Sequence, residues 1–278
     1  VAVFLCEPAN LAAMAVLAKM ASYYPMSSWP LTFLACSGGF SNILYSFGLG
    51  YGLSMTANAG LAPLVAKLEK RTLTPFAWAC CGLYAAYGVR LTSFLMRRQE
   101  EESYKPRFEL LQLKSDMMDL GSKLAIVMGV SFSQALYALP LAVATSSSPV
   151  RARPVLRAVG WAGVGLAGLG LLIESLADEQ KLAAKRDWPR WPVMDGLFSY
   201  CRHPNYFGEF LFHCGISCMG ITGTPIQVAA CVFPTFFMAF TLKNSAARSD
   251  KEADHRYRNC DGYTQWAQTT PLLIPGLL

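Results

Sequence analysis

The sequence predicts an all-α protein, a polytopic transmembrane helical bundle of about seven spans. The chain has 278 residues, of which 53% are hydrophobic and only 15% are charged, whereas a soluble domain carries roughly a quarter of charged residues. Apolar stretches of about the 20 residues that cross a bilayer follow one another along nearly the whole chain. Because lipid does not tolerate the unpaired backbone groups of open strands, these spans are expected to be helices.

Seven stretches are candidate spans. In chain order they are 1–20, 31–53, 73–96, 119–145, 155–176, 205–222 and 226–243. The first is the weakest, because Glu7 and Pro8 interrupt it. A further short helix is expected over 57–68. We divide the chain into N-terminal transmembrane helices and a membrane domain that carries a C-terminal tail. These parts are 1–72, 73–278 and, within the second, the tail 244–278.

Lys and Arg gather in three connecting segments of the chain. The segments are 97–114, 181–202 and 243–258. Two spans separate each segment from the next, so all three are expected on one face of the membrane, the one that the positive-inside rule assigns to the cytoplasm. Arg151, Arg153 and Arg157 fall on the opposite face. The net charge of +6 is modest and long basic runs are absent from the sequence, which argues against nucleic acid as a partner.

Two motifs in the apolar part of the chain resemble ligand-binding motifs, but we predict no ligand at either of them. His213, Cys214 and Cys218 resemble part of a metal site, but a fourth ligand is not evident and no metal is predicted. The stretch 163–168 satisfies G-x-G-x-x-G, yet this dinucleotide fingerprint works only between a strand and a helix. Here it lies inside a span. The small residues Gly160, Gly163, Ala167 and Gly170 share one helical face and instead predict close helix packing.

The span over 155–176 runs into a polar end that carries two carboxylates. Glu174 and Asp178 are four residues apart, so both lie on one helical face at the edge of the membrane. One interpretation is a solvated helix end with weak pairs to Lys181 or Lys185. The other makes the carboxylates acceptors for ribose or amide groups of a bound cofactor. Composition alone leaves both open.

The segment 196–209 is the strongest sign of a binding site. Pro204 suits the first turn of a helix, so Arg202 and His203 immediately precede a helix N-terminus. Free backbone N–H groups and the helix dipole favour a phosphate there, and Arg202 can bind it in a bidentate manner. Three further hydrogen-bonding side chains follow within two turns. They are Asn205, Tyr206 and Glu209.

This segment reads GLFSYCRHPNYFGE and resembles the G-L-W-x-Y-S-R-H-P-N-Y-F-G-E motif of the steroid 5-alpha-reductase-like membrane proteins. More narrowly, it is similar to the branch catalogued as a domain of unknown function. The resemblance covers roughly 75–278, with Phe198 in place of Trp and Cys201 in place of Ser. Other matches follow in family order. They are Arg90-Leu91 with Arg97, Phe132 to Pro140, Glu174 with Asp178 to Gln180, and Leu273-Ile274-Pro275.

The resemblance implies a helical bundle with a cofactor pocket at its cytoplasmic face, which binds NADPH and reduces a carbon–carbon double bond of a sterol or other lipid. By motif position it implies a set of cofactor-binding residues. They are Glu174, Asp178, Lys185, Arg202, His203, Asn205, Tyr206 and Glu209, with His255 in the tail. Tyr206 and Tyr257 are the candidate proton donors. The sequence shows no counterpart of the Glu and Tyr with which steroid reductases engage substrate from their N-terminal half.

Two alternatives to a reductase remain open. One is a non-catalytic, reductase-like subunit of a larger membrane complex, with other membrane subunits as partners. The other is a lipid or isoprenylcysteine methyltransferase using S-adenosylmethionine, which shares an R-H-P-x-Y-x-G core; the lone Glu252, beside Ala253, lacks the Glu-Glu pair of those enzymes. Membrane lipids are expected neighbours in every case. The endoplasmic reticulum is the expected location, with the mitochondrial inner membrane or a plastid membrane as alternatives.

Overall fold

The computed structural model describes residues 24–146, 154–222 and 224–277, and every regular element in these ranges is a helix. The all-α prediction is confirmed for this part of the chain. The longer helices are α2 (Tyr24–Cys36), α4 (Leu49–Leu68), α5 (Pro75–Glu100), α6 (Lys105–Asp116), α7 (Leu120–Leu136), α9 (Pro154–Asp187), α10 (Pro204–Met219) and α11 (Pro225–Tyr257). The shorter ones are α3 (Ile43–Phe47), α8 (Leu139–Thr145) and α12 (Tyr263–Thr269).

Three helical segments in the described residues are long and apolar enough to cross a membrane. They are Leu120–Thr145, which comprises α7 and α8, Pro154–Asp187 and Pro225–Tyr257. The chain is therefore a membrane protein. The predicted span 1–20 lies outside the described residues, and the total of about seven spans stays a prediction.

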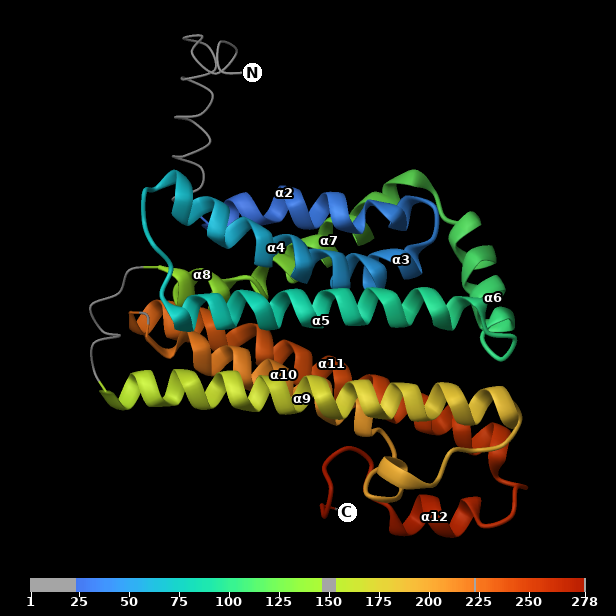
Figure 1. Ribbon diagram of the computed structural model, residues 1–278. Coiled ribbons are helices and arrows are strands. Elements are labelled where there is room, and N and C mark those ends of the chain that lie inside the picture. The colour runs from blue at the N-terminus through green and yellow to red at the C-terminus, as the bar shows by residue number, and fades with distance from the viewer. Residues whose placement is uncertain (1–23, 147–153, 223, 278) are drawn as a thin grey trace.

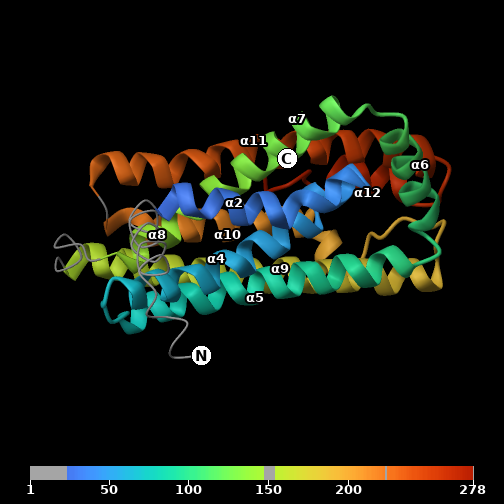
Figure 2. The same cartoon turned by 90° about the horizontal axis from the view of Figure 1, so that it is seen from above.

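The long helices run side by side in a bundle. Figure 1 shows α5 alongside α9, with α10 and α11 packed behind them and α2, α4 and α7 on the other side of α5. The view from above confirms that α5, α9 and α11 run along the same direction (Figure 2). α6 and α12 lie at one end of the bundle, where α5, α9 and α11 also finish. The three Lys- and Arg-rich segments therefore meet at this end, which we call the basic end.

The predicted span 31–53 is not a single helix. α2 stops at Cys36, a short 3-10 turn and α3 follow, and α4 begins only at Leu49. Two local features explain the break. A Cβ on Gly39 would lie 1.8 Å from Ser46 Oγ, so the chain can turn closely there. The Asn42 side chain accepts a hydrogen bond of 2.9 Å from the Leu44 N–H and starts a new helix.

The pair α9–α10 is the most closely packed in the bundle. The small-residue face predicted on α9 is confirmed, because Gly160, Gly163, Ala167 and Gly170 are all buried. A Cβ on Gly170 would lie 2.4 Å from the Phe212 backbone nitrogen of α10. Direct contact of the two backbones fixes the spacing of α9 and α10, and this spacing positions the polar groups further along both helices.

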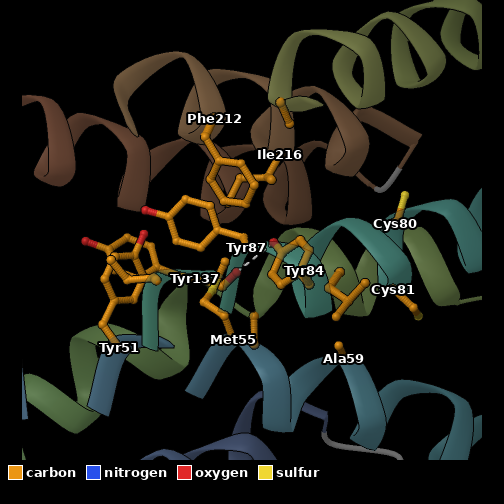
Figure 3. Close-up of a cluster of buried hydrophobic side chains, with 14 of the residues drawn as sticks. Tyr51, Met55, Ala59, Cys80, Cys81, Tyr84, Tyr87, Tyr137, Phe212 and Ile216 are labelled. Carbon is orange, nitrogen blue, oxygen red and sulfur yellow. Dashed lines mark hydrogen bonds between the residues drawn. The ribbon is translucent and has the colours of Figure 1, made fainter. Parts of the chain in front are cut away.

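An aromatic cluster fills the centre of the bundle between α4, α5 and α10. Figure 3 shows Tyr51, Tyr87 and Tyr137 side by side, with Phe212 and Ile216 above them. The Tyr87 ring stacks on Phe212 with centroids 3.9 Å apart. None of these five side chains is more than 5% exposed. Tyr51 comes from α4, so the helix that precedes residue 73 belongs to the same core as the predicted membrane domain.

Candidate functional site

The two carboxylates of α9 bind one guanidinium from α5. Arg90 Nη1 donates to Glu174 Oε1 at 2.8 Å, and Arg90 Nη2 donates to Asp178 Oδ2 at 2.6 Å. Glu174 is 4% exposed and Asp178 is 6% exposed. The solvated helix end considered above is therefore wrong for these two residues: they form a buried ion-pair cluster, which is costly unless every charge is compensated.

The N-terminus of α10 reaches the same cluster through Asn205. Its Nδ2 donates to Asp178 Oδ1 at 3.2 Å. Glu209 lies one turn further along α10 and is close enough to interact electrostatically with Glu174. Within the described residues Glu209 makes no hydrogen bond or ion pair. Three carboxyl groups from two helices thus face a single guanidinium, together with an amide.

Arg202 is held in front of α10 by two contacts. Its Nη1 donates to Asp250 Oδ2 of α11 at 2.6 Å, and its backbone N–H donates to Pro271 O of the tail at 2.8 Å. The side chain is largely buried but its Nε has no partner within the described chain. The guanidinium therefore retains hydrogen-bonding capacity beside a helix N-terminus.

His203 is the N-cap residue of α10 and stacks on Tyr206, with ring centroids 5.2 Å apart and an angle of 10° between the ring planes. Burial, helped by the nearby charges of Lys181 and Arg202, lowers the pKa of His203 to about 3. The ring is therefore neutral at physiological pH. It can donate or accept a hydrogen bond, but it adds no charge to the site.

Several buried polar atoms of this region have no hydrogen-bond partner in the described chain. They are Glu174 Oε2, Arg202 Nε, His203 Nε2 and Asn205 Oδ1. Buried polar atoms are almost always paired in folded proteins, so four such atoms in one region call for a polar ligand or bound water. Both donors and acceptors are among them. A dinucleotide, with phosphates, ribose hydroxyls and an amide, offers complementary groups of both kinds.

The loop before α10 is fixed by Gln180 of α9. Leu197 N–H donates to Gln180 Oε1 at 3.1 Å, and Gln180 Nε2 donates to Asp195 O at 3.2 Å. Gly196 has a φ of +61°, and a Cβ there would lie 1.7 Å from Gln180 Nε2. Cys201, which stands where the motif has Ser, is buried, and burial raises its thiol pKa to about 11. The thiol stays protonated and is not a nucleophile at neutral pH.

The C-terminal tail covers this loop. Trp266 Nε1 of α12 donates to Phe198 O at 3.1 Å, and Tyr263 is 1% exposed. Tyr257 lies in the same region, where its hydroxyl accepts a hydrogen bond of 2.9 Å from Lys185 Nζ. Lys185 also donates to Trp191 O. Lys185 and Tyr257 thus belong to the outer wall, formed by α9 and the tail, while His255 is exposed.

The structure brings together most of the residues predicted from the motif. Glu174, Asp178 and Asn205 are joined by direct bonds, with Glu209 beside them, and Arg202, His203 and Tyr206 lie at the adjoining helix start. Three other members of the region were not predicted as site residues. They are Arg90 and Gln180, which the sequence indicated only as matches to the family pattern, and Asp250. A charged residue inside an apolar stretch is functional by default, and this signal could have identified Arg90.

The resemblance of His213, Cys214 and Cys218 to part of a metal site gains no support from the structure. Nowhere in the described ranges do three or more His, Cys, Asp or Glu side chains group so that they could hold a metal ion. Instead, a hydrogen bond of 2.6 Å joins His213 Nε2 to the Tyr51 hydroxyl, and the tautomer of His213 decides which of them is the donor. This hydrogen bond makes His213 part of the aromatic cluster around Tyr51.

The fold and this region define a helical membrane protein with a buried polar cluster at the start of one inner helix. A family model described as "Protein of unknown function (DUF1295)" matches residues 52–270, and the chain belongs to this family. The match begins within α4 and includes the whole candidate site. No curated protein matches the chain, and no solved structure matches it.

Proposed function

We propose that the protein is an NADPH-dependent membrane oxidoreductase that reduces a carbon–carbon double bond of a sterol or other lipid. The observation that carries this proposal is the group of unpartnered buried polar atoms between α9 and the start of α10. They lie beside a helix N-terminus and a largely buried arginine, which together favour an anionic ligand. The resemblance of the segment 196–209 to the reductase motif supports NADPH as that ligand.

Different residues of the site would bind different parts of such a cofactor. Arg202 and the first backbone N–H groups of α10 suit a phosphate, because both are donors at a positive helix end. Asp178, Glu174 and Asn205 suit hydroxyl and amide groups. Reduced dinucleotide, when bound, supplies a hydride. The apolar helices of the bundle keep water away from the reacting carbons, and a lipid substrate can enter from the surrounding membrane.

NADPH binding to the purified protein tests this proposal directly. Energy transfer from tryptophan to NADPH would be measured in detergent for the wild type and for Arg202→Ala/Asn205→Ala. We expect saturable binding by the wild type and at least about tenfold weaker binding by the double variant, since each charge-assisted hydrogen bond contributes roughly 1.5–3 kcal/mol. Arg157→Ala is the matched control, because Arg157 is exposed at the opposite end of the bundle.

Equal binding by the wild type and the double variant, or none by either, would remove the cofactor claim. Binding of S-adenosylmethionine without NADPH would instead favour methyl transfer. That reading requires Glu252 to act alone; it is exposed and lies 3.7 Å from Arg107.

One observation favours the non-catalytic subunit as the second candidate. Arg90 is already paired with Glu174 and Asp178, and Arg202 with Asp250. These internal pairs compensate the charges of the site without a ligand. Fold does not fix function, and a scaffold can keep such pairs after losing activity. Purification from native membranes distinguishes the two: a stable stoichiometric complex without bound NADPH supports the subunit, and copurifying NADPH supports the reductase.

A further inference from the structure

Polar side chains descend one face of α10 from its N-terminus into the apolar part of the bundle. Asn205, Glu209 and His213 follow at intervals of four residues, so they lie one above another on the helix. At 1.5 Å per residue they cover about 12 Å. A stripe of polar groups with two ionisable members along a membrane helix is rare, and such chains occur in proton relays.

The outer part of this stripe faces the carboxylates of α9. Asn205 binds Asp178, and Arg90 joins Asp178 to Glu174. Glu174 Oε2 has no partner in the described chain although the side chain is only 4% exposed. Glu209 is unpaired as well. Neighbouring carboxyl groups away from water share protons rather than all ionising together, so this group can accept and release a proton.

The inner part of the stripe ends at a tyrosine–histidine pair. The Tyr51 oxygen lies 2.6 Å from His213 Nε2. His213 is fully buried, and its Nδ1 has no partner in the described chain. Tyr137 packs on the same imidazole, with centroids 4.7 Å apart. Figure 3 shows the hydroxyl groups of Tyr51, Tyr87 and Tyr137 on the same side of the cluster.

Glu209 connects the two parts. Its charge acts on Tyr51, Tyr87 and Tyr137 as well as on Glu174. No direct hydrogen bond joins Glu209 to these tyrosines in the described chain, so a proton passing between them would need a bridging water. Arg90 binds two of the carboxylates, and the charges of Arg98 and Lys181 also act on Asp178.

We propose that the polar stripe formed by Asp178, Glu174, Glu209, His213 and Tyr51 is a proton-uptake path from the basic end of the bundle to the Tyr51 hydroxyl. Its use in catalysis rests on the proposed reductase function. There NADPH would supply a hydride to one carbon of the alkene and become NADP⁺, while the Tyr51 O–H bond would break as its proton adds to the other carbon. The Tyr51 oxygen then regains a proton that has entered from water through the carboxyl groups.

Besides its place in the path, His213 positions the Tyr51 hydroxyl in this scheme. When its Nε2 carries the proton, it donates to the Tyr51 oxygen and leaves the Tyr51 hydrogen free to point to the substrate. The same N–H stabilises the tyrosinate that exists after transfer. The carboxyl stripe restores the neutral hydroxyl.

Hydrogen–deuterium exchange at His213 tests the path without substrate or cofactor. The chain has three histidines, so protein labelled with ¹⁵N-histidine gives a simple NMR spectrum that His203→Asn and His255→Asn assign. After transfer of nanodisc-embedded protein into D₂O, the decay of the His213 ring N–H signal gives the exchange rate. We expect Glu209→Gln to slow it at least about tenfold and Glu209→Asp to restore most of it.

A merely structural role for Glu209 predicts an unchanged exchange rate, because Gln preserves the size and polarity of the side chain but cannot carry a proton as a carboxyl group does. The exposed Glu109→Gln is the control and should leave the rate unchanged. Glu174→Gln provides a second test if Glu209→Gln fails to fold. Exchange in either variant at the wild-type rate overturns the path.

NADPH binding measured on the same protein samples distinguishes a failure of the proton path from a failure of the proposed reductase function. Unchanged exchange in Glu209→Gln, with NADPH bound by the wild type, removes the path and leaves the proposed function. Slowed exchange in the variant, with no NADPH binding by the wild type, supports the path and removes the reductase.

Discussion

The two halves of the α9–α10 pair differ in what lies between the helices. In one half, Gly163 and Ala167 of α9 meet Gly215 of α10 so closely that a Cβ on Gly215 would lie 2.4 Å from the Ala167 nitrogen. In the other half, charged side chains face each other and leave polar atoms unpartnered. The same two helices thus form a dry contact at one end and a polar cluster at the other.

This difference indicates that the two halves of the α9–α10 interface have different roles. Backbone contact, which extends from the glycine half as far as Gly208 beside Glu174, leaves no space for a ligand there but sets the distance between the helices. The same spacing continues into the polar half. It brings four side chains close together, those of Glu174, Asp178, Asn205 and Glu209. The glycine half therefore contributes mainly to stability, and the polar half carries the candidate site. Mutations in the two halves should differ in their effects on stability and on ligand binding.

Removing the guanidinium from the polar half should have the largest effect. Arg90→Met leaves Glu174 and Asp178 buried without a cation, and breaking a buried ion pair in this way costs about 3–5 kcal/mol. We expect a large drop in the thermal unfolding midpoint in detergent. Arg90→Met/Glu174→Met/Asp178→Met should recover most of the stability, because no uncompensated charge remains, but should not bind NADPH. A triple variant as unstable as the single one would show that the cluster serves stability.

A methyl group in the glycine half should destabilise the protein by a smaller amount. The Cβ of Gly170→Ala would meet the α10 backbone, and overpacking of this kind costs about 1–3 kcal/mol. Gly168→Ala on the same helix is the matched control, since nothing lies within 4 Å of its Cβ position. The thermal midpoint should fall for the first variant and stay the same or rise slightly for the second. Equal midpoints would contradict the close contact.

Lowering the pH should destabilise the protein through His203. Its folded pKa of about 3 lies below the unfolded value of 6.5, so the unfolded chain takes up the proton first as the pH falls. The stability that the neutral ring contributes is complete above pH 6.5 and is lost towards pH 3, with about 2 kcal/mol lost at pH 5. The fall in thermal midpoint between pH 7.5 and pH 5 should be smaller in His203→Asn than in the wild type. The exposed His255→Asn should behave as the wild type does.

Loosening the loop before α10 should give the smallest change in stability but a visible change in binding. Gln180→Met removes two hydrogen bonds to the loop, each contributing about 1 kcal/mol. Because this loop leads directly to Arg202, we expect weaker NADPH binding, by several-fold, with only a small shift of the thermal midpoint. Gln227→Met is a control, since Gln227 makes its bonds at the far start of α11. Unchanged binding in Gln180→Met would separate the loop from the site.

Helix type and the small-residue face of α9 were predictable from the sequence, because both depend on local composition and spacing. The motif also identified Asn205 and Arg202, since a proline-started helix places them at its N-terminus. The break between α2 and α4 was not predicted, because Gly39 and Asn42 act through contacts with residues several positions away. Arg90 and Asp250 approach the motif only after folding, and the Tyr51–His213 pair joins α4 to α10 across the bundle. Such contacts leave no periodic signal in one sequence.

An electron cryomicroscopy map of the purified protein with NADPH would test the central claim most directly. We predict dinucleotide density that contacts Arg202 and Asn205 at the start of α10 and reaches Asp178, bounded by the tail at α12. The polar half would then be the ligand-binding half of the α9–α10 pair. A map at saturating NADPH in which the Arg202–Asp250 pair is intact and no density lies between α9 and the start of α10 would contradict the account.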